Sequence, residues 1–362
     1  MGEPWHPAAW RSAVAAQQPV YADAAALARV EATLGAAASL VALPQVDELR
    51  ARLAQAASGR ALLLQGGDCA ETFADPDVDG LARLFVDLAA LLPGPTVKLA
   101  RLAGQFAKPR TVEGTVWRGE IVNGRDRLEP DPERMLQAHA HASATMRHVP
   151  DDLFVSHEAL LLPYEQALIR QASDGRWWSG GGHLLWIGER TRQVEGAHVL
   201  FASGIANPIG VKLGDMGADE LRRLLDRIDP QREPGRTTLI VRMGPALGAR
   251  LPALMRALRQ DGRTPLWVSD PLHGNTQRGG LRKVRQLPAI LEEVADFVAI
   301  ARSEGVHPGG LHLEMTPEDV AECTGRDEGE GWTSACDPRL NPRQAARVVS
   351  AFAAGLQQRD AA

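Results

Sequence analysis

Short apolar runs that end in a polar residue recur along most of the chain. Each run is followed by a loop and then by an amphipathic stretch of helical length, such as residues 79–92 and 287–305. Strands that alternate with helices in this way are typical of a parallel sheet covered by helices. The eight apolar runs span residues 61–65, 96–101, 153–158, 183–190, 208–213, 238–243, 265–270 and 310–315.

Eight repeats of strand and helix predict an α/β fold, the closed (β/α)8 or TIM barrel. An open doubly wound sheet is the alternative, but no G-x-G-x-x-G motif marks a strand-to-helix turn, which disfavours its dinucleotide-binding form. The alanine-rich start of the chain predicts helices at 23–34 and 44–57. We therefore expect an N-terminal helical extension over 1–58 and a catalytic barrel over 59–362.

Charged side chains stand at or beside the C-terminal ends of the apolar runs. The C-terminal ends of barrel strands form the active face, so these residues should converge on one mouth. Exposure to solvent alone would explain one or two such charges, but not a ring of them. The ring consists of Asp68, Cys69, Arg101, Glu158, Glu189, Arg190, Lys212, Arg242, Asp270 and Glu314.

The cations of this region predict a site for a small anionic substrate, most simply a phosphorylated one. Arginine binds phosphate or carboxylate through two parallel hydrogen bonds, and lysine binds it as a point charge. Of forty basic residues only four are lysine, at positions 98, 108, 212 and 283, which hints that an ammonium able to lose its proton is needed there. The candidate cations are Arg101, Lys108, Arg110, Arg190, Lys212 and Arg242.

Four residues beside the predicted strands are candidate metal ligands: Cys69, His273, Glu314 and Asp337. A thiolate, an imidazole and two carboxylates suit Mn²⁺, Co²⁺, Zn²⁺ or Fe²⁺ and disfavour calcium and magnesium. The three cysteines have no paired spacing, which favours metal binding or catalysis over a disulfide framework. Cys323 is expected to be packing or a bystander. Cys336 is expected in the core, or else as a spare ligand.

Overall charge and hydropathy exclude several classes of protein. The net charge is −5 and the isoelectric point is near 6.1, which makes nucleic acid a poor partner. There is no apolar run long enough to span a bilayer, and the first residues lack the order of a signal peptide. We expect a cytoplasmic protein.

Longer motifs, in order along nearly the whole chain, resemble those of the class II, or plant-type, DAHP synthases, which are also called phospho-2-dehydro-3-deoxyheptonate aldolases. The chain would be a short form of that family. The motifs are "WHPAAWRSAVAAQQPVY", "LLLQGGDCAETF", "VKLARLAGQFAKPRT", "WRGEIVNG", "SHEALLLPYEQALIR", "HLLWIGERTRQVEGAHVLFASGIANPIGVKLG", "EPGRTTLIVRMG", "SDPLHGNT", "GVHPGGLHLEMTPEDVAEC" and "ACDPRLN".

The resemblance implies a transferase that condenses phosphoenolpyruvate with erythrose 4-phosphate and releases phosphate, at the entry to the shikimate pathway. It implies that Cys69, His273, Glu314 and Asp337 hold a divalent metal ion. It implies phosphoenolpyruvate contacts from Arg101, Glu189, Arg190, Lys212 and Arg242. The aldehyde phosphate would lie at Lys108, Pro109, Arg110 and Thr111, with Asp270.

Lys212 and Lys108 are the expected catalytic residues, since a lysine crowded by arginines should have a lowered pKa and so suit proton transfer. A metal-bound water is the alternative proton carrier. A homo-oligomer is expected at the family level, and a chorismate mutase is a candidate partner.

The chain departs from the family pattern at several positions, and the changes near "KPRT" lie on the acceptor side. Thr111 replaces a serine, Ser269 replaces a cysteine, and Glu120 stands where aspartate is usual. A synthase that uses another aldehyde, such as an amino analogue, is therefore the main alternative. The short chain indicates a form without feedback sites, as in secondary metabolism. A non-catalytic partner subunit and a metal-dependent hydrolase are the remaining alternatives.

Overall fold

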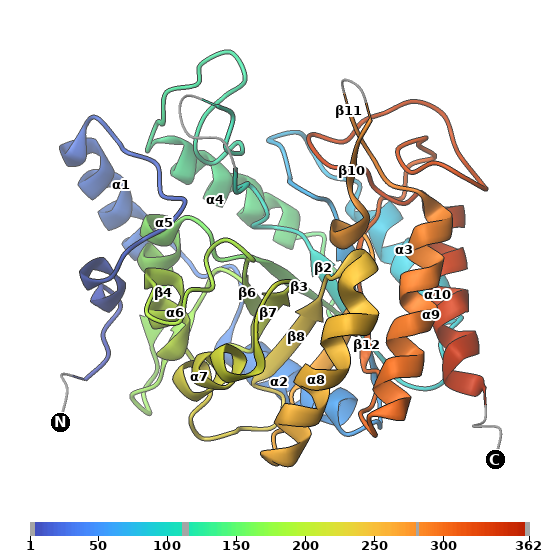
Figure 1. The fold of residues 1–362 in the computed structure, drawn as a ribbon. Helices are drawn as coiled ribbons and strands as arrows, with labels where there is room; N and C mark the ends of the chain where they lie inside the picture. The colour runs from blue at the N-terminus through green and yellow to red at the C-terminus, as the bar shows by residue number, and fades with distance from the viewer. Residues whose placement is uncertain (1–3, 111–115, 280–281, 359–362) are drawn as a thin grey trace.

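Eight parallel strands close into a barrel in the computed structural model, which describes residues 4–110, 116–279 and 282–358 (Figure 1). Neighbouring strands follow one another in chain order, and the first strand pairs with the last. The TIM barrel prediction is confirmed, and the open sheet is excluded. The barrel strands are β1 (Leu62–Gly67), β2 (Thr96–Arg101), β3 (Leu153–Glu158), β6 (Leu184–Ile187), β7 (Ile209–Leu213), β8 (Thr237–Val241), β9 (Leu266–Ser269) and β12 (Gly310–Glu314).

Helices surround the barrel because each buries one apolar stripe against it (Figure 1). In α7, for example, Leu221, Leu224, Leu225 and Ile228 are buried at helical spacing. The helices after β1 are α3 (Val78–Ala89), α4 (Arg134–Met146), α5 (Leu162–Ala167), α6 (Ala197–Ser203), α7 (Ala218–Ile228), α8 (Leu247–Gln260), α9 (Leu287–Ser303) and α10 (Pro342–Gln357).

Short elements complete the fold. Two hairpins leave the barrel, β4 (Ile169–Gln171) with β5 (Trp177–Ser179), and β10 (Gln277–Gly279) with β11 (Arg282–Val284). Three single turns of 3₁₀ helix are η1 (Ala9–Ser12), η2 (Gly244–Ala246) and η3 (His273–Asn275). The turns η2 and η3 directly follow β8 and β9, so they lie at the C-terminal ends of the strands.

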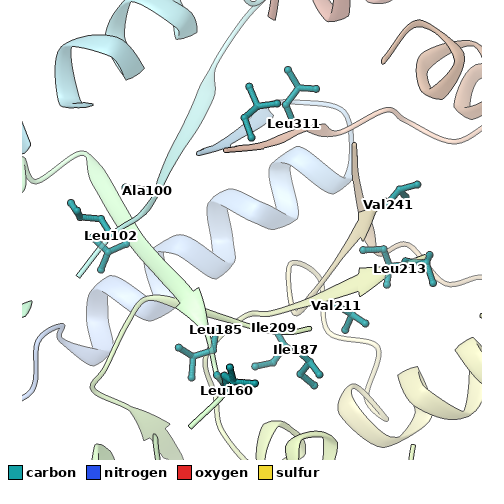
Figure 2. Packing of buried hydrophobic residues seen from close by; sticks show 14 of the residues in the cluster. Ala100, Leu102, Leu160, Leu185, Ile187, Ile209, Val211, Leu213, Val241 and Leu311 are labelled. Carbon is teal, nitrogen blue, oxygen red and sulfur yellow. The ribbon is translucent and has the colours of Figure 1, made fainter. Parts of the chain in front are cut away.

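Alternate residues of each strand face opposite sides of the barrel wall. Figure 2 shows Leu185, Ile187, Val211 and Leu213 on the outer side, in the large cluster that joins the strands to the helices. Between them, Trp186 belongs to a second buried cluster inside the barrel. The strands thus hold two apolar layers, and the polar ends described below lie above the inner one.

The N-terminal helices form where the sequence predicts them, as α1 (Ala24–Ala36) and α2 (Leu43–Ala57). Asp23 caps α1 through its side chain, and Pro44 lies in the first turn of α2. From α2, Leu49 and Leu53 join the cluster inside the barrel. The domain division after residue 58 stays a prediction, but α2 clearly packs against the barrel core.

Among the residues described, no helix is both long enough and apolar enough to cross a membrane. Cys323 is fully buried, as expected for a packing residue.

Leu53 offers a test of the contact between α2 and the barrel. Truncation of this fully buried side chain by Leu53→Ala leaves a cavity and should cost about 2–5 kcal/mol of unfolding free energy. Denaturant unfolding followed by circular dichroism measures this loss. Gln55→Ala, at an exposed position of the same helix, should change stability little. Equal effects of both variants would contradict the packing described.

Candidate active site

The C-terminal mouth of the barrel holds a cavity of about 310 Å³ with a strongly charged lining. Most of the predicted site residues line this one cavity. The residues at the strand ends therefore come together at the mouth, as expected. Glu314 and Asp270 lie next to lining residues, and Thr111 falls outside the described residues. The predicted residues in the lining are Cys69, Arg101, Lys108, Pro109, Arg110, Glu189, Arg190, Lys212, Arg242, His273 and Asp337.

Three of the four predicted metal ligands form one cluster. The ligand atoms of His273, Glu314 and Asp337 all lie within 4.8 Å of one another. His273 Nε2 is 3.1 Å from Glu314 Oε1. One imidazole and two carboxylates form a donor set that fits Mn²⁺, Co²⁺, Zn²⁺ or Fe²⁺.

Local sequence explains how these ligands are presented. Asp270 directly follows β9. Its carboxylate accepts hydrogen bonds from the backbone N–H groups of Leu272 and His273, and these bonds fix the turn that carries His273. Asp337 precedes α10, whose start is fixed by the Asn341 cap followed by Pro342. Glu314 is the last residue of β12.

The surroundings keep both carboxylates charged. Burial would raise the pKa of Glu314, but His273, Arg285 and Arg101 hold it well below its usual range. Burial acts on Asp337 in the same way, and the Lys108 ammonium is the main group that holds its pKa below the usual range. The cluster is therefore negatively charged at neutral pH, as a cation site requires.

Cys69 corrects a prediction from the sequence. The structure joins Cys69 to Cys336 in a disulfide, although the cysteine count favoured metal binding or catalysis over a disulfide. The two residues are 267 positions apart, and no local spacing reveals a contact between the loops after β1 and β12. Cys336 is half-buried, so the expected core position is not observed, and it is the disulfide partner of Cys69.

Cys69 nevertheless lies beside the cluster of His273, Glu314 and Asp337, since the backbone N–H of Asp337 donates to its sulfur at 3.2 Å. Among the forms of a cysteine side chain, only the thiolate is a good metal ligand, and a disulfide is not. Cys69 can therefore act as the fourth ligand only when the disulfide is reduced.

The ion pair of Arg101 with Glu314 joins β2 to β12 across β1, which lies between them. Gly67 is the register partner of both Arg101 and Glu314, which brings Arg101 Nη2 within 3.0 Å of Glu314 Oε1. Gly67 has φ of +138°, and a Cβ there would lie 2.7 Å from the Arg101 carbonyl oxygen. Glycine is thus required for the approach of these strands.

A polar floor lies beneath Arg101 inside the barrel. His312 Nδ1 is 2.7 Å from Gln65 Oε1, and Arg101 Nη1 is 2.7 Å from His312 Nε2. Burial, together with nearby Lys212 and Arg101, holds the pKa of His312 well below its usual range. A neutral His312 fits this chain, donating to Gln65 and accepting from Arg101.

Lys212 is the most strongly perturbed lysine of the cavity. Burial is the main cause that lowers its pKa to about 8, and Arg101 and Arg242 add to the effect. The lowered pKa expected from crowding by arginines is therefore present, but burial is the larger cause. Asp270 opposes the shift through an ion pair of 2.5 Å.

Asp270 links Lys212 to His273 of the candidate ligand cluster. Its carboxylate lies 2.7 Å from His273 Nδ1 as well as beside Lys212. The sequence placed Asp270 with the aldehyde phosphate, whereas its contacts are with the Lys212 and His273 side chains. Burial would raise its pKa, but His273 and Lys212 hold it well below the usual range.

Glu189 holds backbone as well as lining the cavity. Its carboxylate accepts from the N–H groups of Gly214 and Asp215, after β7, and pairs with Arg192 at 2.5 Å. Arg242 lies 3.8 Å away. Glu189 therefore fixes the loop after β7 and leaves Arg242 loosely paired.

Lys108 and Arg110, from the loop after β2, also line the cavity. Lys108 Nζ lies 2.7 Å from Asp337 Oδ2. Arg110 Nε donates to the Trp117 carbonyl at 2.8 Å, and its guanidinium lies over the Trp117 ring. These contacts place the cations of "KPR" at the mouth beside the candidate ligand cluster.

Two further residues, Lys283 and Arg285, belong to the site that the sequence did not assign to it, and Glu158 of the predicted ring is found there as expected. Lys283, from the β10–β11 hairpin, lies 2.5 Å from Asp337 Oδ1. Arg285 is fully buried and lies 2.5 Å from Glu314 Oε2. Glu158 lines the cavity, and its Oε1 is buried with no hydrogen bond to any described residue. The scarcity of lysine was a usable signal, because Lys108, Lys212 and Lys283 all line this cavity.

Comparison with known proteins identifies the family. The model of the class-II DAHP synthetase family matches residues 5–151 and 147–353. The chain belongs to this family. The resemblance and the prediction of a DAHP synthase class enzyme, an aldol-type transferase, are thereby confirmed.

Two curated relatives match almost throughout. A phospho-2-dehydro-3-deoxyheptonate aldolase of Streptomyces coelicolor is 39% identical, with 92% of this chain and 94% of the relative covered. A probable phospho-2-dehydro-3-deoxyheptonate aldolase of Pseudomonas fluorescens is 40% identical, with 94% and 95% covered. The Streptomyces alignment runs over 422 positions against 362 residues here, so that relative carries insertions that this chain lacks.

Among solved structures, a phospho-2-dehydro-3-deoxyheptonate aldolase from Francisella tularensis matches with a TM-score of 0.56. It covers 87% of this chain and 92% of its own, at 16% sequence identity. This likeness supports the barrel fold of the DAHP synthetase family member described here.

The disulfide predicts that metal affinity depends on reduction. Protein reduced with a phosphine should bind Zn²⁺ at least ~10-fold more tightly than oxidised protein, because a ligand thiolate is regained. Calorimetric titration measures both affinities. Cys336→Ser, which cannot form the disulfide, should bind Zn²⁺ equally in either condition. Equal affinity of the oxidised and reduced wild-type protein would exclude Cys69 as a ligand.

Proposed function

We propose that this enzyme condenses phosphoenolpyruvate with erythrose 4-phosphate to give 3-deoxy-D-arabino-heptulosonate 7-phosphate and phosphate, with a divalent metal ion. The observation that carries the proposal is one cavity that joins a negatively charged ligand cluster to a wall of cations. The names of both curated relatives support the same reaction.

The donor would bind at the Lys212 side of the cavity. Three cations, Arg190 after β6, Lys212 in β7 and Arg242 directly after β8, are available for the phosphate and carboxylate of phosphoenolpyruvate. Arg101 supports them from the floor, and Glu189 fixes the loop beside Arg242. Holding the donor in one orientation replaces part of a bimolecular encounter.

The acceptor would bind beside the loop after β2, with its phosphate toward Lys108, Pro109 and Arg110. Its aldehyde would then point to the cluster of His273, Glu314 and Asp337, which would hold the metal together with reduced Cys69. A metal ion there supplies Lewis-acid polarisation of the aldehyde oxygen.

Residues between the donor and acceptor subsites would transfer the protons. Attack of the enol carbon on the aldehyde carbon makes an alkoxide, and Lys212, whose pKa of about 8 suits proton donation near neutral pH, supplies its proton. Asp270 orients the Lys212 ammonium. Water then adds to the cationic former enol carbon, returns a proton, and phosphate leaves. Lys108 stabilises negative charge at the acceptor.

A different acceptor, such as an amino analogue, remains the second proposal, because Thr111 replaces a family serine in the "KPRT" segment, on the acceptor side. The homo-oligomer, the chorismate mutase partner and a role in secondary metabolism stay predictions. Complete retention of the ligand set argues against a non-catalytic subunit.

A phosphate-release assay with phosphoenolpyruvate and a panel of aldose phosphates tests the proposal. We expect turnover with erythrose 4-phosphate, loss of turnover after chelation, and recovery with Mn²⁺, Co²⁺ or Zn²⁺. Turnover with another aldehyde alone would select the second proposal. Absence of turnover with every aldehyde, in metal-loaded and reduced protein, would refute both.

The pKa of Lys212 predicts an alkaline limb. Below about pH 8 its ammonium is charged and attracts the donor, and above that pH the charge is lost. The kcat/KM for phosphoenolpyruvate, which reports the free enzyme, should therefore fall ~10-fold per pH unit on the alkaline side. Lys212→Arg should shift this limb to higher pH, since guanidinium stays charged, while kcat falls ~10²-fold or more. An unshifted limb in that variant would assign the titration to another group.

A further inference from the structure

The first described residues form a strap along one side of the barrel mouth; we call residues 4–21 the N-terminal strap. Trp5 Nε1 donates to the Leu200 carbonyl at 2.8 Å, and the Val14 carbonyl accepts from Ala197 N–H at 3.0 Å. Trp10 Nε1 donates to Gln166 Oε1 at 2.9 Å. These bonds fasten the strap to α5 and α6, and Figure 1 shows its dark-blue trace beside them before α1.

Gln17 reaches from the strap into the loop after β2. Its side-chain Oε1 accepts from the backbone N–H of Arg110 at 2.8 Å. Gln17 has φ of +64°, a left-handed conformation that residues other than glycine adopt at a cost. Such strain persists where the surrounding structure enforces it and is common at functional sites.

The segment that Gln17 holds has little regular structure of its own. Residues 108–110 lie in no helix or strand. Lys108 N–H donates to the Arg118 carbonyl at 2.8 Å, and Arg110 N–H donates to Gln17. The acceptor of the second bond, the Gln17 side chain, therefore belongs to a residue more than ninety positions earlier in the chain.

The neighbouring Gln18 holds the next loop. Its Nε2 donates to the Leu160 carbonyl at 2.7 Å, and its Oε1 accepts from Leu162 N–H at 3.0 Å. This loop directly follows Glu158 at the end of β3. Two adjacent glutamines thus fix the backbone after β2 and after β3, whereas the donor cations lie in or after β6, β7 and β8.

We propose that Gln17 is a positioning residue for the acceptor: it fixes the backbone of Lys108–Arg110 so that their cations meet the acceptor phosphate. The inference rests on the proposed function for the role of these two cations. It assigns to the strap a part in acceptor affinity and none in donor or metal affinity.

The test is a split between the two Michaelis constants. Gln17→Ala should raise the KM for erythrose 4-phosphate ~5-fold, the size of one neutral hydrogen bond. The KM for phosphoenolpyruvate and the affinity for Zn²⁺ should stay within twofold. Gln17→Glu keeps an acceptor oxygen and should restore the wild-type KM. Arg11→Ala, which removes strap contacts to Gln166 and Glu31 far from the loop, is the matched control.

Hydrogen exchange of the Arg110 amide gives a readout independent of turnover, and Gln17→Ala should accelerate it. Unchanged exchange and unchanged acceptor KM would overturn the inference, and so would an equal rise of both Michaelis constants, which marks a merely structural role. If wild-type protein turns over only another aldose phosphate, that substrate replaces erythrose 4-phosphate in the same comparison. Absence of turnover with all of them would refute the proposed function, and this inference with it.

Discussion

Buried carboxylates make it possible for many cations to meet at the barrel mouth. Glu314 faces Arg101, Arg285 and His273, Asp337 faces Lys108 and Lys283, and Asp270 faces Lys212. A buried charge without a partner costs several kcal/mol. Neither the carboxylates nor the cations could therefore be buried here without the other. The charge balance of this network is the constraint on which the rest of the site depends.

This balance has a consequence for ligand binding. A divalent cation at Glu314 and Asp337 would compete with the side-chain cations that now pair with them. Anionic substrates would in turn replace the carboxylates as partners of Lys108 and Lys283. Metal and phosphate binding can therefore proceed as an exchange of partners, which keeps each buried charge compensated.

The sequence was sufficient for the barrel and for the residues at its strand ends. Strand periodicity and the rule that active sites lie at the C-terminal mouth placed Arg101, Lys212 and Glu314 together without knowledge of any contact. The contacts between loops were not predictable in this way. The Cys69–Cys336 disulfide and the bond from Gln17 to Arg110 join segments whose proximity follows from the closed barrel, and no local pattern encodes it.

Lysine and arginine occupy different kinds of position in this site. Arg285, beneath Glu314, is buried with its carboxylate partner, and a guanidinium suits it because it stays charged at any physiological pH. Lys212 instead has a pKa brought down to about 8 by burial, a change that arginine cannot undergo usefully. Of the four lysines of the chain, Lys108, Lys212 and Lys283 line this one cavity, where a compact ammonium can approach a carboxylate. Arginine supplies charge that stays fixed, and Lys212 supplies a charge that can change near neutral pH.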